Sequence, residues 1–401
     1  MQDSMQETTM HDTSVFRPLD GIRVLDLSRY LPGPYLTRML RDLGAEVVKI
    51  EPIEGEAMRF MPPRVDGMGA TFSALEADKD SVALDLKKPE GVALFRALVA
   101  HADVLVEAFR PGKLAALGLD FVSLQALNPG LILCSITGNG QTGSRAQTAG
   151  HDLNYVATTG LLHLFGPPDG PPTVPGVQLA DVAGGSLPAA IGILGALLER
   201  QTTGRGRHLD INMTLGALAL AANAYPTLAA GAVEPRGRGM LTGGAPAYRC
   251  YQTQDGRYIA LAGMEPHFFA TFCRLVEHPE WASLSYRTDA KGVALIEKLQ
   301  ALFLTRTADA WMALCDGHDI CINIVRTPEE AMADPEFASV IRTQGSLKLV
   351  TAAVGAPTQP PSRPASRLGS DAPEVTRRWQ VPADVRDAAV SSGALLWPGE
   401  G

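Results

Sequence analysis

The chain has 401 residues, of which 46% are hydrophobic and 19% are charged, an ordinary balance for a folded globular protein. Its formal net charge of −8 excludes nucleic acid as the main partner, because phosphate backbones are bound by basic surfaces. Five cysteines are too few for a disulfide framework in a chain of this length, so we expect a reducing, cytoplasmic environment.

Three segments bear on targeting and membranes. Residues 1–14 are polar and contain no apolar signal region, so we expect a disordered tail over residues 1–15. Residues 184–198 are almost wholly apolar but too short to span a bilayer, and residues 213–233 are interrupted by polar residues and a proline. We expect both to be buried or interface helices, with no membrane partner.

Strand and helix patterns alternate through the first third of the chain. The patterns predict strands at 22–27, 46–50, 104–106 and 131–136, with helices at 34–43 and 89–101. This alternation predicts an α/β fold in which helices cover a mostly parallel sheet.

A second pattern follows Asp181. In this part the sequence predicts a helix to Arg200, a strand at 208–211, an Ala-rich helix and a Gly- and Arg-rich linker at 231–244. A hairpin is expected at 247–261, with Asp255 and Gly256 at its turn. We therefore expect two lobes, with the boundary inside 225–245.

Two motifs suggest ligands that their context does not support. Gly138, Gly140 and Gly143 fit the dinucleotide pattern G-x-G-x-x-G, but the last glycine leads into a loop instead of a helix. A glycine-rich loop that lets some other ligand approach closely fits better. Cys315, His318 and Cys321 are one ligand short of a structural zinc site, so we expect no metal.

Four acid/base residues stand in informative surroundings, and three of them also have a structural alternative. His151 and Asp152 are expected at the start of a helix, whose free N–H groups stabilise negative charge; alternatively, Asp152 is an N-cap and His151 a surface residue. Asp181 lies in an apolar stretch that raises the pKa of a carboxyl group, although it also fits an N-cap. Glu265 is a lone acid before Pro266, at an expected helix start.

Together the segments resemble the family III CoA-transferase (CaiB/BaiF-type) superfamily, and within it the α-methylacyl-CoA racemases. The superfamily resemblance lies in residues 18–27 (PLDGIRVLDL), 42–51 (DLGAEVVKIE), 109–112 (FRPG) and 137–143 (TGNGQTG). The racemase branch is resembled in residues 150–155 (GHDLNY), 243–248 (GGAPAY) and 265–268 (EPHF).

The resemblance implies a role for each candidate residue. His151, paired with Glu265, and Asp181 are implied as acid/bases on opposite faces of a substrate carbon, with Asp152 orienting the site. Arg110 and the loop of Gly138 and Gly140 are implied near coenzyme A, which is part of the substrate and not a prosthetic group. Lys79 is implied as a further coenzyme A-binding residue, because it is the one cation that remains in a segment where the superfamily is usually rich in basic residues.

The implied reaction interconverts (R)- and (S)-2-methylacyl-CoA thioesters, a step of fatty acid metabolism, through an enolate. Two alternatives stay open: a CoA-transferase in which Asp181 is the nucleophile of an acyl anhydride, and a non-catalytic CoA-binding homologue. Transferases of the superfamily generally lack a histidine at position 151 and the 265–268 segment, which favours the racemase.

The resemblance also implies the architecture. A large Rossmann-like domain would comprise residues 16–225, completed by 330–401, and a small α+β domain would comprise residues 226–329. Two such chains interlock as a homodimer in this superfamily, so Glu265 would reach a site from the small domain of the same or the other chain.

Overall fold

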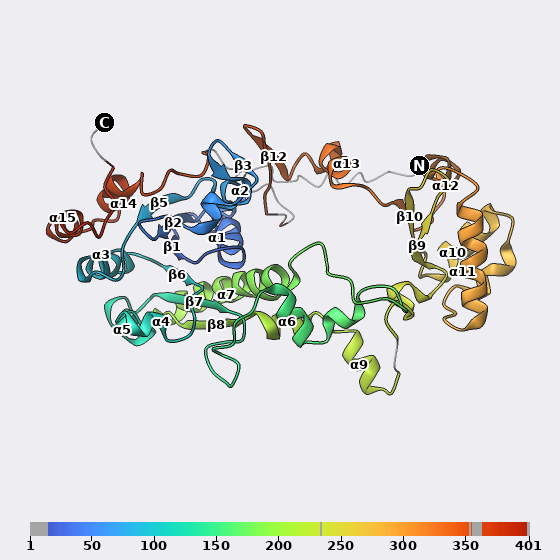
Figure 1. The fold of residues 1–401 in the computed structure, drawn as a ribbon, viewed down its shortest axis with the longest axis horizontal. Helices are drawn as coiled ribbons and strands as arrows, with labels where there is room; N and C mark the ends of the chain where they lie inside the picture. Colours follow the sequence, from blue (N-terminus) through green and yellow to red (C-terminus); the bar gives the residue numbers. More distant parts are fainter. Residues whose placement is uncertain (1–14, 233–234, 353, 355–362, 399–401) are drawn as a thin grey trace, which may run out of the picture. The chain divides into compact units, whose positions relative to one another are not determined.

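The computed structural model describes residues 15–232, 235–352, 354 and 363–398. The chain divides into two compact units (Figure 1). The first unit contains Met1–Tyr155, Gln178–Ala217 and Pro335–Gly401, and the second contains Val156–Val177 and Leu218–Asp334. The tail expected over residues 1–15 lies, apart from Val15, outside the described residues.

A six-stranded parallel sheet organises the first unit, in the order β5-β2-β1-β6-β7-β8. The expected α/β class with a mostly parallel sheet is therefore confirmed. The strands are β1 (Arg23–Leu27), β2 (Glu46–Glu51), β5 (Asp80–Ala83), β6 (Val104–Glu107), β7 (Ile132–Thr137) and β8 (His208–Asn212). Two small antiparallel pairs accompany them: β3 (Arg64–Val65) with β4 (Met68–Gly69), and β12 (Ile341–Gln344) with β13 (Leu347–Val350).

The helices of this part of the chain connect the strands and cover the sheet. They are α1 (Pro32–Asp42), η1 (Ala57–Phe60), α2 (Ala70–Glu76), α3 (Pro89–Val99), α4 (Lys113–Ala116), α5 (Phe121–Leu127), α6 (Asp152–Thr158), η3 (Leu179–Ser186), α7 (Leu187–Thr203), α8 (Met213–Ala219), η6 (Pro335–Phe337), α14 (Ala372–Arg378) and α15 (Ala383–Ser391). Pro32 and Pro89 start α1 and α3, where a missing backbone N–H costs no hydrogen bond.

Apolar and polar side chains alternate along β1, so one face of the sheet borders an apolar core and the other face borders polar groups. Successive side chains of a strand point to opposite faces of the sheet. Leu25 and Leu27 of β1 therefore enter an apolar core, whereas Asp26 between them faces the hydroxyl of Thr37 in α1.

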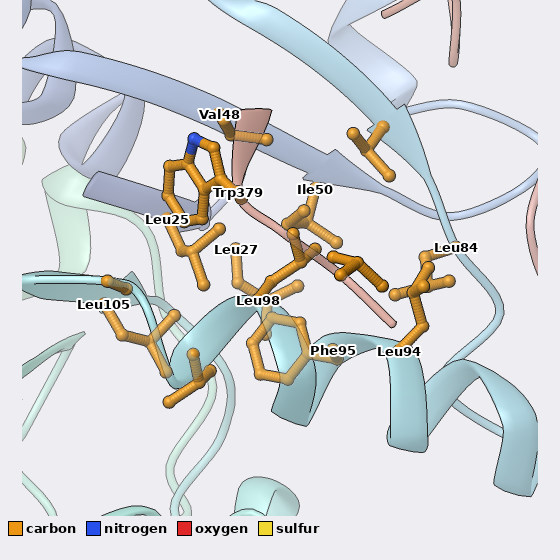
Figure 2. Close-up of a cluster of buried hydrophobic side chains, with 14 of the residues drawn as sticks. Leu25, Leu27, Val48, Ile50, Leu84, Leu94, Phe95, Leu98, Leu105 and Trp379 are labelled. Atoms are coloured by element: carbon orange, nitrogen blue, oxygen red, sulfur yellow. The ribbon is translucent and has the colours of Figure 1, made fainter. Parts of the chain in front are cut away.

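The apolar core is completed by residues far apart in the sequence. Trp379, directly after α14, is fully buried among side chains of the first strands and α3, including Leu25, Val48 and Leu98 (Figure 2). Its indole N–H also donates a hydrogen bond to Glu46 at the start of β2. The carboxyl-terminal helices are thus part of the same core as β1 and β2.

The second unit is built on a three-stranded antiparallel sheet, in the order β11-β10-β9. The expected hairpin is present as β9 (Tyr248–Gln252) and β10 (Tyr258–Ala262), joined by β11 (Ile322–Ile324). Its helices are η2 (Leu161–Leu164), α9 (Ala224–Ala229), η4 (Met240–Gly244), α10 (Pro266–Leu275), η5 (Pro279–Leu284), α11 (Ala290–Phe303), α12 (Ala308–Cys315) and α13 (Pro328–Ala333). Stacked aromatic rings of Tyr251, Phe303 and Phe272 form the centre of its core.

Helix α7 buries one side and exposes the other. Ala189, Ile193 and Ala196 are buried, and the helix contacts β7 and β8. A stripe of leucine and isoleucine side chains runs along the exposed side: Leu187, Ile191, Leu194 and Leu198. Among the described helices, the segment Leu179–Thr203 alone is long and apolar enough to cross a membrane, a property that a core helix of a soluble protein shares.

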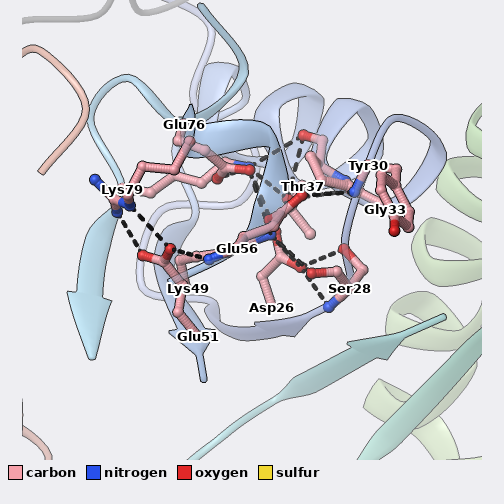
Figure 3. A network of polar contacts seen from close by, with 12 residues as sticks. Asp26, Ser28, Tyr30, Gly33, Thr37, Lys49, Glu51, Glu56, Glu76 and Lys79 are labelled. Carbon is pink, nitrogen blue, oxygen red and sulfur yellow. Dashed lines mark hydrogen bonds and ion pairs between the residues drawn. The ribbon is translucent and has the colours of Figure 1, made fainter. Parts of the chain in front are cut away.

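A cluster of buried charges occupies the other face of β1 and β2 (Figure 3). The ammonium of Lys49 lies 2.8 Å from Glu56 and 3.3 Å from Glu76, and that of Lys79 lies 2.7 Å from Glu76 and 3.4 Å from Asp26. All five side chains are at most 4% exposed. Burial alone would raise the pKa of Asp26, but Lys49 and Lys79 outweigh it and hold that pKa well below its ordinary value.

The buried cluster predicts a large effect of removing one cation. Lys49→Met leaves three buried carboxylates with only Lys79 to compensate them, which costs about 3–5 kcal/mol of unfolding free energy. Denaturant unfolding with a probe of the first unit measures this change. The exposed residue Lys291 supplies the control: Lys291→Met should stay within about 0.5 kcal/mol of the wild type. Equal effects of the two substitutions would contradict the prediction.

Candidate active site

A cavity of about 520 Å³ opens where β7 ends in the first unit. Loops that follow the carboxyl ends of parallel strands converge at this point, which is the usual place for a ligand in such a sheet. The cavity is lined, among others, by Arg110, Gly138, His151, Tyr155, Asp181 and Met213. The structure thus brings together four residues that the sequence analysis singled out.

Hydrogen bonds join α6 to η3, the segment that carries Asp181. Asp152 is the first residue of α6, and its carboxylate accepts hydrogen bonds from the backbone N–H groups of Ala180 and Asp181, at 2.6 and 3.0 Å. These N–H groups belong to the first turn of η3, where they have no partner within the helix. Asp152 therefore fixes the backbone of Asp181.

The surroundings of Asp181 change its acidity. Burial first, and then the negative charge of Asp152, raise the pKa of Asp181 to about 6, whereas His151 acts in the opposite direction. A carboxyl group with such a pKa holds equal amounts of its two protonation states near pH 6 and keeps a protonated fraction of about one tenth at pH 7. It can therefore both accept and return a proton.

His151 stands directly before α6 and is exposed toward the cavity. Its backbone N–H donates to the side-chain oxygen of Asn154 at 3.0 Å, and its carbonyl accepts from the N–H of Asn154 at 2.8 Å. Glu265, the residue implied to pair with it, belongs to the second unit, where it is exposed and precedes Pro266 of α10.

The glycine-rich loop has a packing function as well as an exposed edge. A Cβ atom on Gly138 would lie 2.4 Å from the hydroxyl oxygen of Tyr155, and one on Gly140 would lie 3.0 Å from the side-chain amide nitrogen of Asn212. Gly140 also has a φ of +83°, which favours glycine. Both glycines therefore admit neighbouring side chains, while Gly138 also lines the cavity.

Lys79 was expected to bind coenzyme A, but it belongs to the buried ion cluster. Its ammonium is 1% exposed and contacts Asp26, Glu76, Thr37 and the carbonyl of Pro34. A phosphate group cannot reach a cation enclosed in this way, so the predicted contact with coenzyme A does not fit the structure. Among the described residues, no group of three or more His, Cys, Asp or Glu side chains is placed to hold a metal ion.

A second cavity of about 430 Å³, which was not predicted from the sequence, lies beside the first. The two cavities share Arg29, Tyr30 and Phe109 as lining residues, so they adjoin. Lys87 and Lys113 line the second cavity, and Glu51 in its wall is paired with Arg59 at 2.5 Å. Arg29 follows β1 and Lys113 follows β6, so a search for cations beyond the ends of the predicted strands would have found both.

Comparison with known proteins places the chain in a family. The model of CoA-transferase family III matches residues 19–375, so the chain belongs to that family. It is 35% identical over 332 residues to succinyl-CoA:glutarate CoA-transferase from Homo sapiens, covering 81% of this chain and 75% of that protein. It is 38% identical over 322 residues to alpha-methylacyl-CoA racemase from Homo sapiens, covering 78% and 79% of the two chains.

A solved structure agrees with this assignment. The crystal structure of a CAIB/BAIF family protein from Brucella suis is similar with a TM-score of 0.79 and 33% identity, over 90% of this chain and 99% of that one. The relatives include both transferases and racemases of acyl-CoA thioesters at comparable identity. The chain is therefore a family III protein related to both CoA-transferases and an acyl-CoA racemase.

The site predicts an unusual titration. A carbon-13 signal from the carboxyl group of Asp181 should titrate with a midpoint near pH 6, well above the ordinary value of 3.8. Asp181→Asn identifies the signal by its disappearance. Asp152→Asn should move the midpoint to lower pH, because it removes a like charge and keeps an oxygen that accepts the two N–H groups. A midpoint near 4 in the wild type would mean that burial and Asp152 do not raise the pKa of Asp181.

Proposed function

We propose that the protein is an α-methylacyl-CoA racemase, which interconverts (R)- and (S)-2-methylacyl-CoA thioesters. The observation that carries this proposal is that His151 and Asp181 line one cavity, with the pKa of Asp181 raised to about 6. Inversion at a carbon needs two groups that exchange protons, one on each face. The relatives that are racemases, and the motifs around His151 and Glu265, support the same activity.

The proposed reaction follows from the acidity of a carbon next to a thioester. One of the two groups takes the α-proton, and the electron pair of the C–H bond moves into an enolate on the thioester oxygen. The other group, already protonated, then returns a proton to the opposite face of the carbon. Exchange of both groups with solvent restores their protonation states, and Asp152 holds Asp181 in place throughout.

A transferase is the second candidate, because several relatives transfer CoA between acids. In that reaction the carboxylate of Asp181 would attack the thioester carbonyl, forming an acyl anhydride and releasing the thiolate of CoA. The histidine in the same cavity argues for the racemase, since a carboxylate nucleophile does not need a second proton carrier beside it.

Exchange of the α-proton with solvent distinguishes these functions. In D2O, the wild type should incorporate deuterium into both enantiomers of a 2-methylacyl-CoA. His151→Ala and Asp181→Asn should each lower racemisation by about 10²–10⁴-fold, the usual contribution of a positioned acid/base. Each should retain exchange only from the enantiomer whose proton the remaining group takes.

His101 lines neither cavity and provides the control, because His101→Ala should leave exchange unchanged. Acyl transfer from CoA to a free acid that depends on Asp181, without exchange in the wild type, would establish a transferase. Binding of CoA without either reaction would identify a non-catalytic homologue.

We further propose that the second cavity takes the ADP part of coenzyme A. Its cations Arg29 and Lys113 are exposed, and its volume suits a ligand of this size. Arg29→Ala and Lys113→Ala should each weaken CoA binding about tenfold, as expected for one charge-assisted hydrogen bond. Calorimetric titration measures this, with Lys291→Ala as the control. Equal weakening of an acyl-pantetheine thioester, which lacks ADP, would exclude the proposed contact.

The same proposal includes a homodimer. The exposed apolar stripe of α7 presents Ile191 with 72% and Leu198 with 67% of its surface accessible, and a second copy of the chain would cover it. Sedimentation should give twice the mass of one chain for the wild type. Ile191→Glu should favour the single chain, because it places a charge in the contact. A wild type that sediments as one chain would contradict this assembly.

A further inference from the structure

Tyr155 is a buried residue of the candidate site to which the proposed reaction assigns no task. It lies in the first helical turn of α6, and its side chain is 7% exposed. Its hydroxyl donates a hydrogen bond of 2.6 Å to the carbonyl of Gly150, the residue directly before His151. A hydrogen bond of this kind connects the helix to the peptide that carries the histidine.

The ring of Tyr155 is wedged between two glycines. A Cβ atom on Gly138 would lie 2.4 Å from the hydroxyl oxygen, and one on Gly150 would lie 2.7 Å from Cε1 of the ring. Real Cβ contacts are essentially never shorter than 3.0 Å, so neither position admits a larger residue while the ring stays in place. The ring therefore spans from the end of β7, before Gly138, to the peptide before His151.

The two acid/base residues are held by different groups. The backbone of Asp181 is fixed by two hydrogen bonds to Asp152. On the other side, Gly150 has the conformational freedom of glycine, and the hydroxyl of Tyr155 restrains its carbonyl. Burial, and next the charge of Asp181, raise the pKa of Tyr155, so its hydroxyl keeps the proton that it donates.

We propose that Tyr155 is a positioning residue for His151: its hydroxyl and ring fix the Gly150 peptide and thereby direct the imidazole toward the substrate carbon. Asp181 does not depend on this contact. The inference rests on the proposed function, because it assigns His151 and Asp181 to opposite faces of one carbon. It also explains why position 138 is a glycine, because a larger residue there would clash with Tyr155.

The experiment compares exchange from the two enantiomers. His151→Ala first identifies the enantiomer whose proton His151 takes. Tyr155→Phe keeps the ring and removes the hydrogen bond, so exchange from that enantiomer should fall about tenfold while exchange from the other changes less than twofold. The KM for the thioester should stay unchanged, because the hydroxyl is directed at Gly150 and not at the ligand.

Two further variants separate positioning from general stability. Tyr251→Phe is a matched control, because the hydroxyl of Tyr251 also donates to a backbone carbonyl, that of Pro246, in the second unit. It should leave the ratio of the two exchange rates unchanged. Introduced into the otherwise wild-type protein, Gly138→Ala should displace the ring and so lower exchange from the same enantiomer as Tyr155→Phe does. In a Tyr155→Ala background, Gly138→Ala should cause no further loss of exchange.

Several outcomes would overturn the inference. Equal loss of exchange from both enantiomers would indicate a structural role, and complete loss from one would make Tyr155 a proton carrier itself. An independent measurement is the carbon-13 signal of the His151 ring, which should shift in Tyr155→Phe but not in Tyr251→Phe. An unchanged ring signal refutes the positioning role even if the wild type proves to be a transferase, whereas absence of wild-type exchange alone refutes only the racemase.

Discussion

The buried ion cluster on one face of β1 and β2 is the constraint on which the geometry of both cavities depends. Lys49 donates to the carbonyl of Ser28 at 2.8 Å, and Glu56 accepts from the backbone N–H of Tyr30 at 2.6 Å. The backbone of the turn after β1 is therefore held by hydrogen bonds to two buried charged side chains. That turn carries Arg29, which borders both cavities. A buried charge is tolerated only with its partners in place, so the turn has little freedom to move.

The segments that carry His151 and Asp181 are held in place by hydrogen bonds to their backbone groups and not by buried ion pairs. Asp152 accepts from two N–H groups of η3, and Tyr155 donates to the carbonyl before His151. Both partners come from the single helix α6, so one short helix fixes two segments with different roles. The side chains of His151 and Asp181 both line the cavity. The arrangement lets both side chains face a cavity while hydrogen bonds restrain the backbone beside each of them.

The sequence predicted the sheet because its strands are short β-branched and apolar runs that alternate with helical patterns. It also indicated His151, Asp152 and Asp181, since each acid/base residue stands beside glycine or apolar neighbours at an expected helix start. Lys79 was expected near coenzyme A because the family resemblance implies basic residues in its segment, and only the fold reveals the carboxylates around it. Tyr155 was not singled out, because its partners are glycines and a carbonyl that carry no signal of contact in the sequence.

Trp379 has a consequence for the order in which the protein is made. Its side chain completes a core that begins with Leu25, more than 350 positions earlier, and α14 and α15 pack against the same strands and α3. A ribosome releases the amino-terminal strands and α3 first, but the part of the core that Trp379, α14 and α15 supply is added only when the last part of the chain has emerged. The second unit, whose core draws on residues between Ala247 and Ile322, is complete well before then. During synthesis, all residues of the second unit's core are therefore available before those of the first unit's core.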